Sequence, residues 1–331
     1  MKRIGGLKEV FLSYENFDRA EQIVRKGKSS SRGVVNFDKK YPTKELREAA
    51  LRSLIKEVES MKFQSTPPVT FPRETSGGKT RNISVIPYFP DIVLQQAVLN
   101  VIKTRLKKHL THDVYSFDQG VHLLCRRLQR TIHGWPEDEP LYALKLDVRK
   151  FYETIDPDIL KYVIRRLIKD IYVLYIIENI IDVHRGLTIG MFLSQLFSSI
   201  FLSVFDHEVK EELGAKYYYR YADDMLALSS SKKDLHELLY RMRNRLFYDY
   251  GLELKYWQVF DVETRPIDYV GYVFHRTHTQ VRKRTKQNFA RRRHNRKSVA
   301  SYLGIMKWCN SRNLIYKILE ENNNAKKCTD K

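Results

Sequence analysis

The most informative stretch of this chain is Tyr219-Arg220-Tyr221-Ala222-Asp223-Asp224 (YRYADD), inside the longer segment KYYYRYADDMLALS (216–229). The residues on both sides of the Asp-Asp pair predict a strand, a tight turn and a second strand. Two adjacent carboxylates at such a turn cannot both be buried unpaired without a steep electrostatic cost, which a divalent cation removes. Oxygen ligands favour Mg²⁺, which commonly uses one or two carboxylates together with substrate phosphates. The alternative interpretation is a solvated Asp-Asp turn.

A further carboxylate is predicted at the end of another strand. The segment LYALKLDV (141–148) alternates, with apolar residues on one face and Lys145 and Asp147 on the other. A strand-end aspartate beside an Asp-Asp turn suits a two-metal phosphoryl-transfer site, whose ions lie about 4 Å apart. Arg149 and Lys150 follow directly, where they can neutralise a triphosphate. The alternative is that Asp147 only ends a strand.

The remaining sequence predicts a mixture of helices and extended segments. The dipeptide Asp156-Pro157 supplies a helix N-cap and a proline at the first helical position. Helices are also predicted over much of residues 1–65, over Gln95–Leu110 and Val121–Thr131, and from about Met191 to Glu212. Residues 66–80 predict extended segments around a Ser-Gly-Gly turn.

The charge of the chain points to a polyanionic partner. The 331 residues include 59 Lys and Arg against 39 Asp and Glu, a net charge of +20. Thirteen Lys and Arg and no acidic residue lie between Tyr269 and Leu319, whereas a surface tuned only for solubility would mix the signs. Apolar residues within this region predict a folded basic lobe rather than a loose tail.

Several protein classes fit the sequence poorly. The three cysteines (Cys125, Cys309 and Cys328) contain no CxxC pair, which argues against a disulfide framework or a zinc ribbon and fits a reducing cytoplasm. The apolar segment Ile171–Ile181 is interrupted by Glu178 and is too short to span a membrane. We therefore expect a cytoplasmic protein without a membrane partner.

Further motifs occur in order along nearly the whole chain. They are MKRIGGL (1–7), IPYFPD (86–91), LKLDVRKFYETIDPDIL (144–160), IGMFLSQ (189–195), YRYADD (219–224), IDYVGY (267–272) and SVASYLGIMKWCNS (298–311). In these motifs the chain resembles reverse transcriptases, most closely those of diversity-generating retroelements of the Bacteroides-like group. The Ser-Gln that ends IGMFLSQ separates this group from group II intron and retron enzymes, where Pro-Gln-Gly is usual.

The resemblance implies catalytic roles for residues of the two predicted strands. Asp147, Asp223 and Asp224 match the three metal ligands, with Val148 beside them, for two Mg²⁺ ions that Mn²⁺ could replace. Tyr152 matches the aromatic steric gate, whose ring would collide with a ribose 2′-hydroxyl and so select deoxynucleotides. The alternative for Tyr152 is a core tyrosine packed under the strand.

The resemblance also implies a nucleotide site. Arg81 matches the fingers arginine that clamps the incoming triphosphate, with Lys79 assisting; the alternative is an exposed loop arginine. Lys255 matches a lysine that protonates the leaving pyrophosphate, although a charge at a helix end is an equal alternative. The other residues expected at the nucleotide are Arg149, Lys150, Phe151, Tyr152, Ile189, Gly190 and Gln195.

Template and primer are expected to contact a separate group of residues. Gly271 falls in the primer-grip hairpin, and the basic lobe resembles the thumb, which holds the duplex through salt-sensitive phosphate contacts. The residues assigned to template and primer are Tyr221, Ser194, Gly271, Arg282, Lys283, Arg291, Arg292 and Arg293.

Taken together, these motifs imply an α+β right-hand polymerase. We expect fingers over residues 1–140, a palm with an antiparallel sheet over 141–275, a basic helical thumb over 276–320 and a frayed tail over 321–331. The enzyme would use dNTPs to copy a template-repeat RNA into error-prone, adenine-mutagenised cDNA that diversifies a variable protein gene. It would bind the template RNA and the RNA/cDNA duplex. A basic, oligomeric accessory variability protein is the implied partner. The alternatives are an antiphage-defence or retron-type reverse transcriptase, and a catalytically idle RNA-binding protein.

Ile189 carries a hypothesis about fidelity. Many reverse transcriptases have at this position a glutamine that hydrogen-bonds the incoming nucleotide, whereas isoleucine offers no donor. Losing one good polar contact relaxes selectivity by about one or two orders of magnitude. The alternative is that Ile189 only fills a gap in the core.

Overall fold

The computed structural model describes residues 3–74, 80–184, 186–188, 190 and 193–319. The chain forms two compact units, each built from separated stretches. Unit 1 contains Met1–Thr111, Arg149–His207 and Arg245–Glu253. Unit 2 contains His112–Val148, Glu208–Asn244 and Leu254–Lys331.

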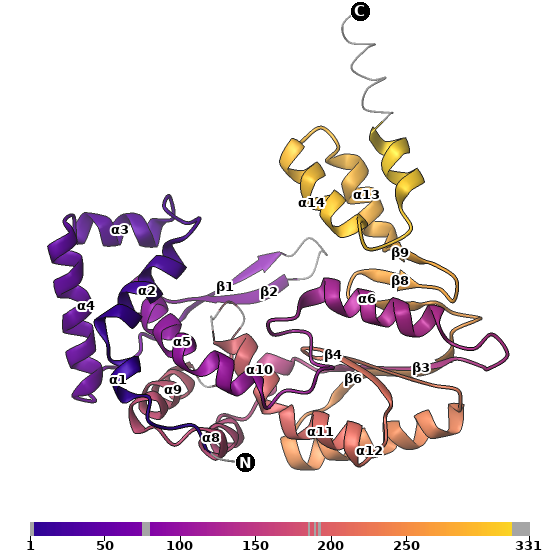
Figure 1. Ribbon diagram of the computed structural model, residues 1–331, viewed down its shortest axis with the longest axis horizontal. Helices are drawn as coiled ribbons and strands as arrows, with labels where there is room; N and C mark the ends of the chain where they lie inside the picture. The colour runs from indigo at the N-terminus through magenta and orange to yellow at the C-terminus, as the bar shows by residue number, and fades with distance from the viewer. Residues whose placement is uncertain (1–2, 75–79, 185, 189, 191–192, 320–331) are drawn as a thin grey trace, which may run out of the picture. The chain divides into compact units, whose positions relative to one another are not determined.

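Unit 1 is mainly helical (Figure 1). Polar side chains cap two of these helices: Ser13 Oγ accepts a hydrogen bond from the backbone N–H of Asn16 at the start of α2 (Tyr14–Arg25), and the Asp156 carboxylate accepts from the N–H of Asp158 at the start of α8 (Pro157–Leu167). The N-cap predicted at Asp156 is therefore confirmed. The helices are α1 (Lys8–Phe11), α2 (Tyr14–Arg25), α3 (Arg32–Lys40), α4 (Lys44–Glu59), η1 (Tyr88–Ile92), α5 (Val93–Lys107), α7 (Phe151–Thr154), α8 (Pro157–Leu167), α9 (Ile171–His184) and α10 (Ser194–Phe201).

The helix predicted from about Met191 to Glu212 is two helices in the structure. α10 ends at Phe201, and α11 (Ser203–Glu211) begins after a break at Leu202. The hydroxyls of Ser198 and Ser199 donate to the carbonyl of Gln195 at 3.1 and 2.9 Å. Such bonds back to the preceding turn compete with the helical ladder and bend helices, which the hydrophobic pattern alone did not reveal.

Unit 1 also contains one antiparallel hairpin, β1 (Val69–Glu74) with β2 (Thr80–Val85). Val69 pairs with Val85 at one end and Glu74 with Thr80 at the other. The extended segment predicted before the Ser-Gly-Gly turn is confirmed as β1, whereas the second strand begins at Thr80, the last residue of the predicted range. The Ser-Gly-Gly turn itself lies outside the described residues.

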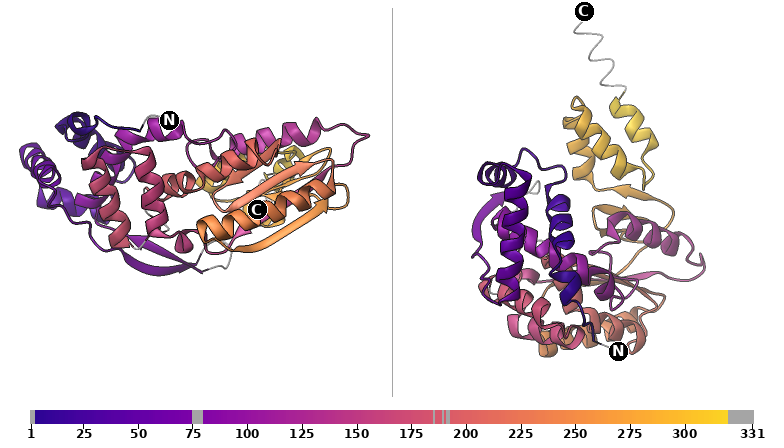
Figure 2. Two further views of the ribbon diagram at one scale, coloured as in Figure 1. Left: turned by 90° about the horizontal axis from the view of Figure 1, so that it is seen from below. Right: turned by 60° about the vertical axis from the view of Figure 1, so that its left-hand side comes forward.

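Unit 2 is organised around a four-stranded antiparallel sheet with the order β4-β5-β3-β6. Its strands are β3 (Tyr142–Val148), β4 (Tyr217–Tyr221), β5 (Asp224–Ser229) and β6 (Leu254–Asp261). The strand predicted over 141–148 and the hairpin predicted over 216–229 are both confirmed. α6 (Gly120–His133) covers one face of this sheet, and the part of α12 (Lys232–Tyr250) that belongs to unit 2 covers the other (Figure 1, Figure 2).

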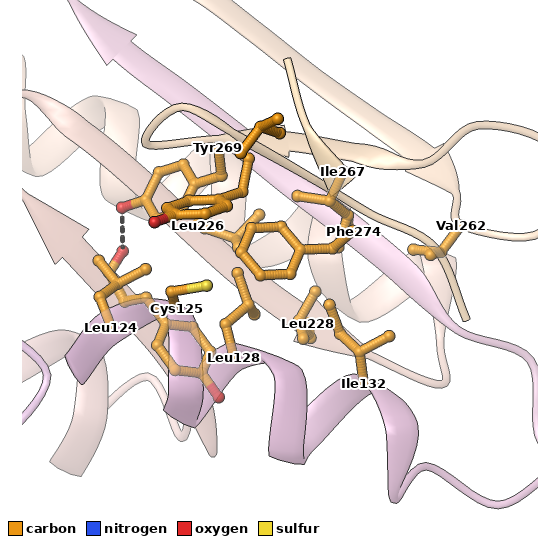
Figure 3. Packing of buried hydrophobic residues seen from close by; sticks show 14 of the residues in the cluster. Leu124, Cys125, Leu128, Ile132, Leu226, Leu228, Val262, Ile267, Tyr269 and Phe274 are labelled. Carbon is orange, nitrogen blue, oxygen red and sulfur yellow. Dashed lines mark hydrogen bonds between the residues drawn. The ribbon is translucent and has the colours of Figure 1, made fainter. Parts of the chain in front are cut away.

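The hydrophobic core of unit 2 lies on the α6 side of the sheet. Figure 3 shows Leu124 and Leu128 of α6 pointing toward Leu226 and Leu228 of β5. A second, three-stranded sheet adds to the same core: β7 (Ile267–Tyr269), β8 (Tyr272–Phe274) and β9 (Thr279–Val281).

The basic lobe is helical, as the sequence indicated. It contains α13 (Lys283–Arg291) and α14 (Arg296–Met306), and Asn295 caps α14 through a bond from the Ser298 N–H. The rings of Phe289 and Tyr302 lie 5.4 Å apart and join the two helices. Among the residues that the structure describes, no helix is long and apolar enough to span a bilayer.

Candidate active site

A two-residue turn presents the adjacent aspartates at the end of the four-stranded sheet. Tyr221 and Asp224 pair across the hairpin, which leaves Ala222 and Asp223 as the turn. Ala222 has a φ of 54°, a left-handed conformation that costs a non-glycine residue about 1–3 kcal/mol. The fully buried Arg220 donates from Nη1 to the carbonyl of Ala222 at 3.2 Å. The buried arginine therefore stabilises the strained turn and the position of both aspartates.

Asp147 lies directly opposite Asp224 on the neighbouring strand. The two residues are register partners of β3 and β5, so both side chains lie on the same face, where like charges repel. The pKa of Asp224 is raised, mainly by burial and further by Asp147, while the nearby Lys145 ammonium opposes the shift. A cation beside the two carboxylates would relieve their repulsion.

The donor set fits a hard divalent ion such as Mg²⁺. Asp224 Oδ1 is buried and accepts no hydrogen bond from the described part of the chain. Residues 3–74, 80–184, 186–188, 190 and 193–319 contain no group of three Asp, Glu, His or Cys side chains arranged to hold a metal by themselves. Mg²⁺ usually binds through one or two carboxylates and takes its other ligands from water and phosphates, which Asp147 and Asp224 satisfy.

Asp223 and Val148 join the turn to the end of β3. The backbone N–H of Val148 donates to the carbonyl of Asp223 at 3.4 Å. This bond holds the third aspartate beside the strand that carries Asp147. The role of Asp223 and of Val148 as metal ligands stays a prediction.

Lys145 belongs to the site, although its role was not predicted from the sequence. Its Nζ lies 3.8 Å from Asp224 Oδ1 and donates a 2.8 Å hydrogen bond to the carbonyl of Asp268 in β7. Lys145 occurs two residues before Asp147 in a strand, so the period-two spacing was the signal that could have found it.

Tyr269 connects β7 to the β4–β5 hairpin and was likewise not predicted from the sequence. Its buried hydroxyl donates to the carbonyls of Asp224 at 2.8 Å and of Tyr219 at 3.1 Å. Burial, with a smaller effect of the Asp224 charge, raises the pKa of Tyr269 well above the ordinary value, so the hydroxyl stays protonated and donates. The motif IDYVGY marked this segment, but the carbonyls that accept from Tyr269 belong to β4 and β5.

A β-bulge places Lys255 at the same end of the sheet. Asp147 pairs with Tyr256 and Val148 pairs with Leu254, so Lys255 is the extra residue on β6. Bulges next to active sites redirect a side chain, and Lys255 is exposed. Its predicted contact with the leaving pyrophosphate stays a prediction.

Gly271 and Arg282 lie in the three-stranded sheet and its exit. Tyr269 pairs with Tyr272, and Val270 and Gly271 form the turn with φ values of 43° and 94°. The N–H of Arg282 donates to the carbonyl of Gly271 at 3.2 Å. The Arg282 guanidinium forms an ion pair with the Asp268 carboxylate. Arg282 is therefore engaged with the hairpin, and a contact with primer stays a prediction.

The other residues that the sequence assigned to a thumb lie on and after α13. Lys283 begins the helix and Arg291 ends it, and both are exposed, as is Arg292. Arg293 is half-buried, with Nη1 donating to the carbonyl of Ala290 at 3.2 Å. This group presents positive charge without acidic neighbours in the sequence.

The remaining predicted nucleotide residues belong to unit 1. Arg149 lies 3.8 Å from Glu253 and Lys150 lies 3.7 Å from Glu153, and both side chains are exposed. Phe151 is buried, with its ring 5.6 Å from that of Tyr152. The Tyr152 hydroxyl accepts a bond from Ser198 Oγ at 3.5 Å.

Ser194 and Gln195 begin α10, at the helix start where the motif predicted them. Ser194 is buried and Gln195 is exposed. Gly190 has a φ of 106°, and a Cβ there would lie 2.6 Å from the carbonyl oxygen of Ser84. The close approach at Gly190 is therefore to β2, and the predicted approach to a base pair stays a prediction. Ile189 lies outside the described residues.

Arg81 is exposed on β2, opposite Arg73 of β1. Two arginines facing one another across an exposed hairpin repel unless an anion lies between them, which is compatible with a triphosphate clamp. Lys79 lies outside the described residues.

Comparisons with known proteins agree with this geometry. A family model described as "Reverse transcriptase (RNA-dependent DNA polymerase)" matches residues 73–274. The fold is similar to apo telomerase from Candida tropicalis truncated from its C-terminal domain, with a TM-score of 0.52 and 15% identity over 67% of this chain and 55% of that chain. Telomerase from Candida albicans in complex with a telomeric RNA fragment gives a TM-score of 0.53 and 12% identity over 85% of this chain and 60% of that one.

The chain thus spans little more than half the length of these telomerase structures. Their low identity makes the likeness one of fold. No curated protein matches the sequence.

Proposed function

The chain belongs to the reverse transcriptase (RNA-dependent DNA polymerase) family and has the α+β right-hand polymerase fold, and from this premise we propose that it copies RNA into DNA with Mg²⁺. One observation carries the proposal. Asp147 and Asp224 face each other across β3 and β5, and Asp224 has a buried oxygen that accepts no hydrogen bond from the residues that the structure describes. A protein that only binds RNA has no use for two opposed, partly buried carboxylates.

The proposed chemistry assigns separate tasks to the residues of unit 2. When bound, Mg²⁺ would lower the pKa of the attacking primer hydroxyl and neutralise the charge of the departing pyrophosphate. Asp147 and Asp224 would hold the ion, and Asp223 would be the third ligand. Arg220 keeps the turn in its strained conformation, and Tyr269 fixes the backbone of Asp224. Lys255 would give a proton to the leaving pyrophosphate.

The proposal is tested by primer extension with dNTPs on an RNA template. We expect D147N and D224N each to lower Mg²⁺-dependent incorporation by about three orders of magnitude or more, since each variant removes one ionised ligand. Binding of template and primer without metal should remain close to wild type, because those contacts are to phosphates elsewhere.

Asp234→Asn is the matched control, since Asp234 is an exposed carboxylate at the start of α12 in the same unit. It should extend primers at the wild-type rate. Wild-type incorporation by D147N or D224N contradicts the site. Binding of RNA without any incorporation by the unmodified protein would favour the idle RNA-binding alternative.

The finer role that we propose is that of a diversity-generating retroelement, in which cDNA with errors opposite template adenines replaces part of a variable gene. Its support is the Ser194-Gln195 pair that ends IGMFLSQ. Sequencing cDNA made on a defined RNA decides the matter: errors concentrated at adenines support it, and low, uniform errors favour a retron-type or antiphage-defence enzyme. Ile189→Gln should lower the error frequency if Ile189 relaxes selectivity.

A basic, oligomeric accessory variability protein is the proposed protein partner. An open reading frame for such a protein beside the gene, together with a template and variable repeat pair, is expected. Co-expression should then yield a complex that survives gel filtration. A genome without either feature contradicts this partner.

A further inference from the structure

Lys145 occupies an unusual position between the catalytic carboxylates and β7. It lies on the same face as Asp147, and its β5 register partner is Leu226, two residues after Asp224. The side chain is 19% exposed and that of Asp224 is 29% exposed, so both charges are partly withdrawn from water.

The contacts of the ammonium group are unequal. Nζ donates to the carbonyl of Asp268 at 2.8 Å, a good hydrogen bond. Its distance of 3.8 Å from Asp224 Oδ1 is too long for a hydrogen bond but close enough for a strong electrostatic interaction. The lone pairs of Asp224 Oδ1 therefore remain open to another ligand while the charge of Lys145 acts on it.

The other charges near Asp224 do not replace that of Lys145. Arg282 and Asp268 also act on Asp224, but they form an ion pair with each other, so their effects oppose. Asp147 adds a second negative charge opposite Asp224. Lys145 thus offsets one negative charge of this pair, and a divalent ion would offset both.

We propose that Lys145 is a stand-in cation, which balances Asp147 and Asp224 before a divalent metal ion binds and competes with that ion for Asp224. The inference rests on the proposed metal site of the polymerase. When the ion enters, the ammonium is repelled from Asp224 but keeps its bond to the Asp268 carbonyl. The charge of Lys145 therefore stabilises the metal-free site and, for the same reason, lowers the affinity of the site for a metal ion.

The test is Lys145→Met, measured with Mn²⁺ alone by titration of the free Mn²⁺ electron paramagnetic resonance signal. Methionine keeps an unbranched side chain along the sheet but removes the charge. We expect Mn²⁺ to bind roughly tenfold more tightly than to wild type, because the variant lacks the positive charge that lies 3.8 Å from a carboxylate that would hold the ion. Mn²⁺ should also raise the unfolding temperature more in this variant than in wild type.

Lys210→Met is the matched control. Lys210 forms a partly buried ion pair with Asp113 at 3.2 Å and donates to the carbonyl of Lys216 at 2.8 Å, so its bonding resembles that of Lys145. It lies outside the carboxylate set, and its loss should leave the Mn²⁺ affinity unchanged. Lys145→Arg keeps the charge and should also bind Mn²⁺ with about the wild-type affinity.

The outcomes separate this inference from the proposed function. Unchanged or weaker Mn²⁺ binding by K145M overturns the competition, because a purely structural lysine would weaken the site on removal. A tenfold gain in Mn²⁺ affinity in K145R would also overturn the competition, because that variant keeps the charge. The K145R measurement remains available if K145M does not fold. Wild-type Mn²⁺ affinity in D224N would instead overturn the metal site itself.

Discussion

The ring of Tyr152 is supported by its neighbours. It packs against the buried Phe151, and its hydroxyl lies 3.5 Å from the Oγ of the buried Ser198. A steric gate needs this kind of support, since a ring free to rotate would move aside for a ribose. Such packing is compatible with both a steric gate and a core tyrosine. Substitution of Tyr152 distinguishes the two interpretations.

Tyr152→Val should increase incorporation of ribonucleotides relative to deoxynucleotides by about 10- to 200-fold, the range that steric fit in a pocket supplies. Tyr152→Phe is the control, because it keeps the ring and loses only the acceptor for Ser198. Competition between rNTPs and dNTPs in primer extension gives the ratio. The same ratio in Tyr152→Val and wild type would assign Tyr152 to the core.

Beyond the single residue, the segment that carries Gly190 depends on β2. With a φ of 106° and only 2.6 Å between an added Cβ and the Ser84 carbonyl oxygen, Gly190 has both a conformational and a spatial reason to be glycine. This close approach places Gly190 beside the hairpin that carries Arg81. Two motifs that are separate in the sequence are therefore neighbours in unit 1.

Gly190→Ala should lower the free energy of unfolding of unit 1 by about 2–4 kcal/mol, from strain at positive φ and a backbone clash. Gly27→Ala is the matched control in the same unit, with a φ of 71° and no atom within 4 Å of the added Cβ. It should lower the free energy by only about 1 kcal/mol. Urea unfolding measures both, and equal losses would contradict the contact with Ser84.

For the whole molecule, the distribution of charge matters more than its sum. The net charge is +20, and the thirteen basic residues between Tyr269 and Leu319 have no acidic residue among them. In the structure Arg291 and Arg292 are exposed, so their charge is available to phosphates. Arg293 already donates a hydrogen bond to a backbone carbonyl, so its guanidinium is less free to bind a phosphate.

Replacing Arg291, Arg292 and Arg293 together by Gln should weaken binding to a template–primer duplex and flatten its log–log salt dependence by up to about three units. Fluorescence anisotropy at several salt concentrations measures the slope. Lys26, Lys28 and Arg32, replaced by Gln, form a control of equal charge on exposed residues of unit 1, and should leave the slope unchanged. An unchanged slope in the triple variant would show that these arginines do not bind the duplex phosphates and would favour a contact with a protein partner.

The sequence alone determined the elements that depend on local patterns. Alternation placed Lys145 and Asp147 on one face of β3, and the aromatic residues around Asp223 predicted the hairpin. Asp156 predicted a helix start because an N-cap is satisfied within three residues. Such features need only neighbours along the chain, so the pattern of residue types is sufficient to predict them.

The tertiary structure decided what those elements meet. Register made Asp147 the partner of Asp224 and left Lys255 in a bulge, and it brought the Tyr269 hydroxyl and the Asp268 carbonyl to residues 45 and 123 positions away. The break at Leu202 was also missed, because serine hydroxyls bonding back to a carbonyl leave no trace in hydrophobic periodicity. A hydrogen-bond partner or a neighbouring charge on another strand depends on pairing across the sheet, and residue types along one strand do not specify that pairing.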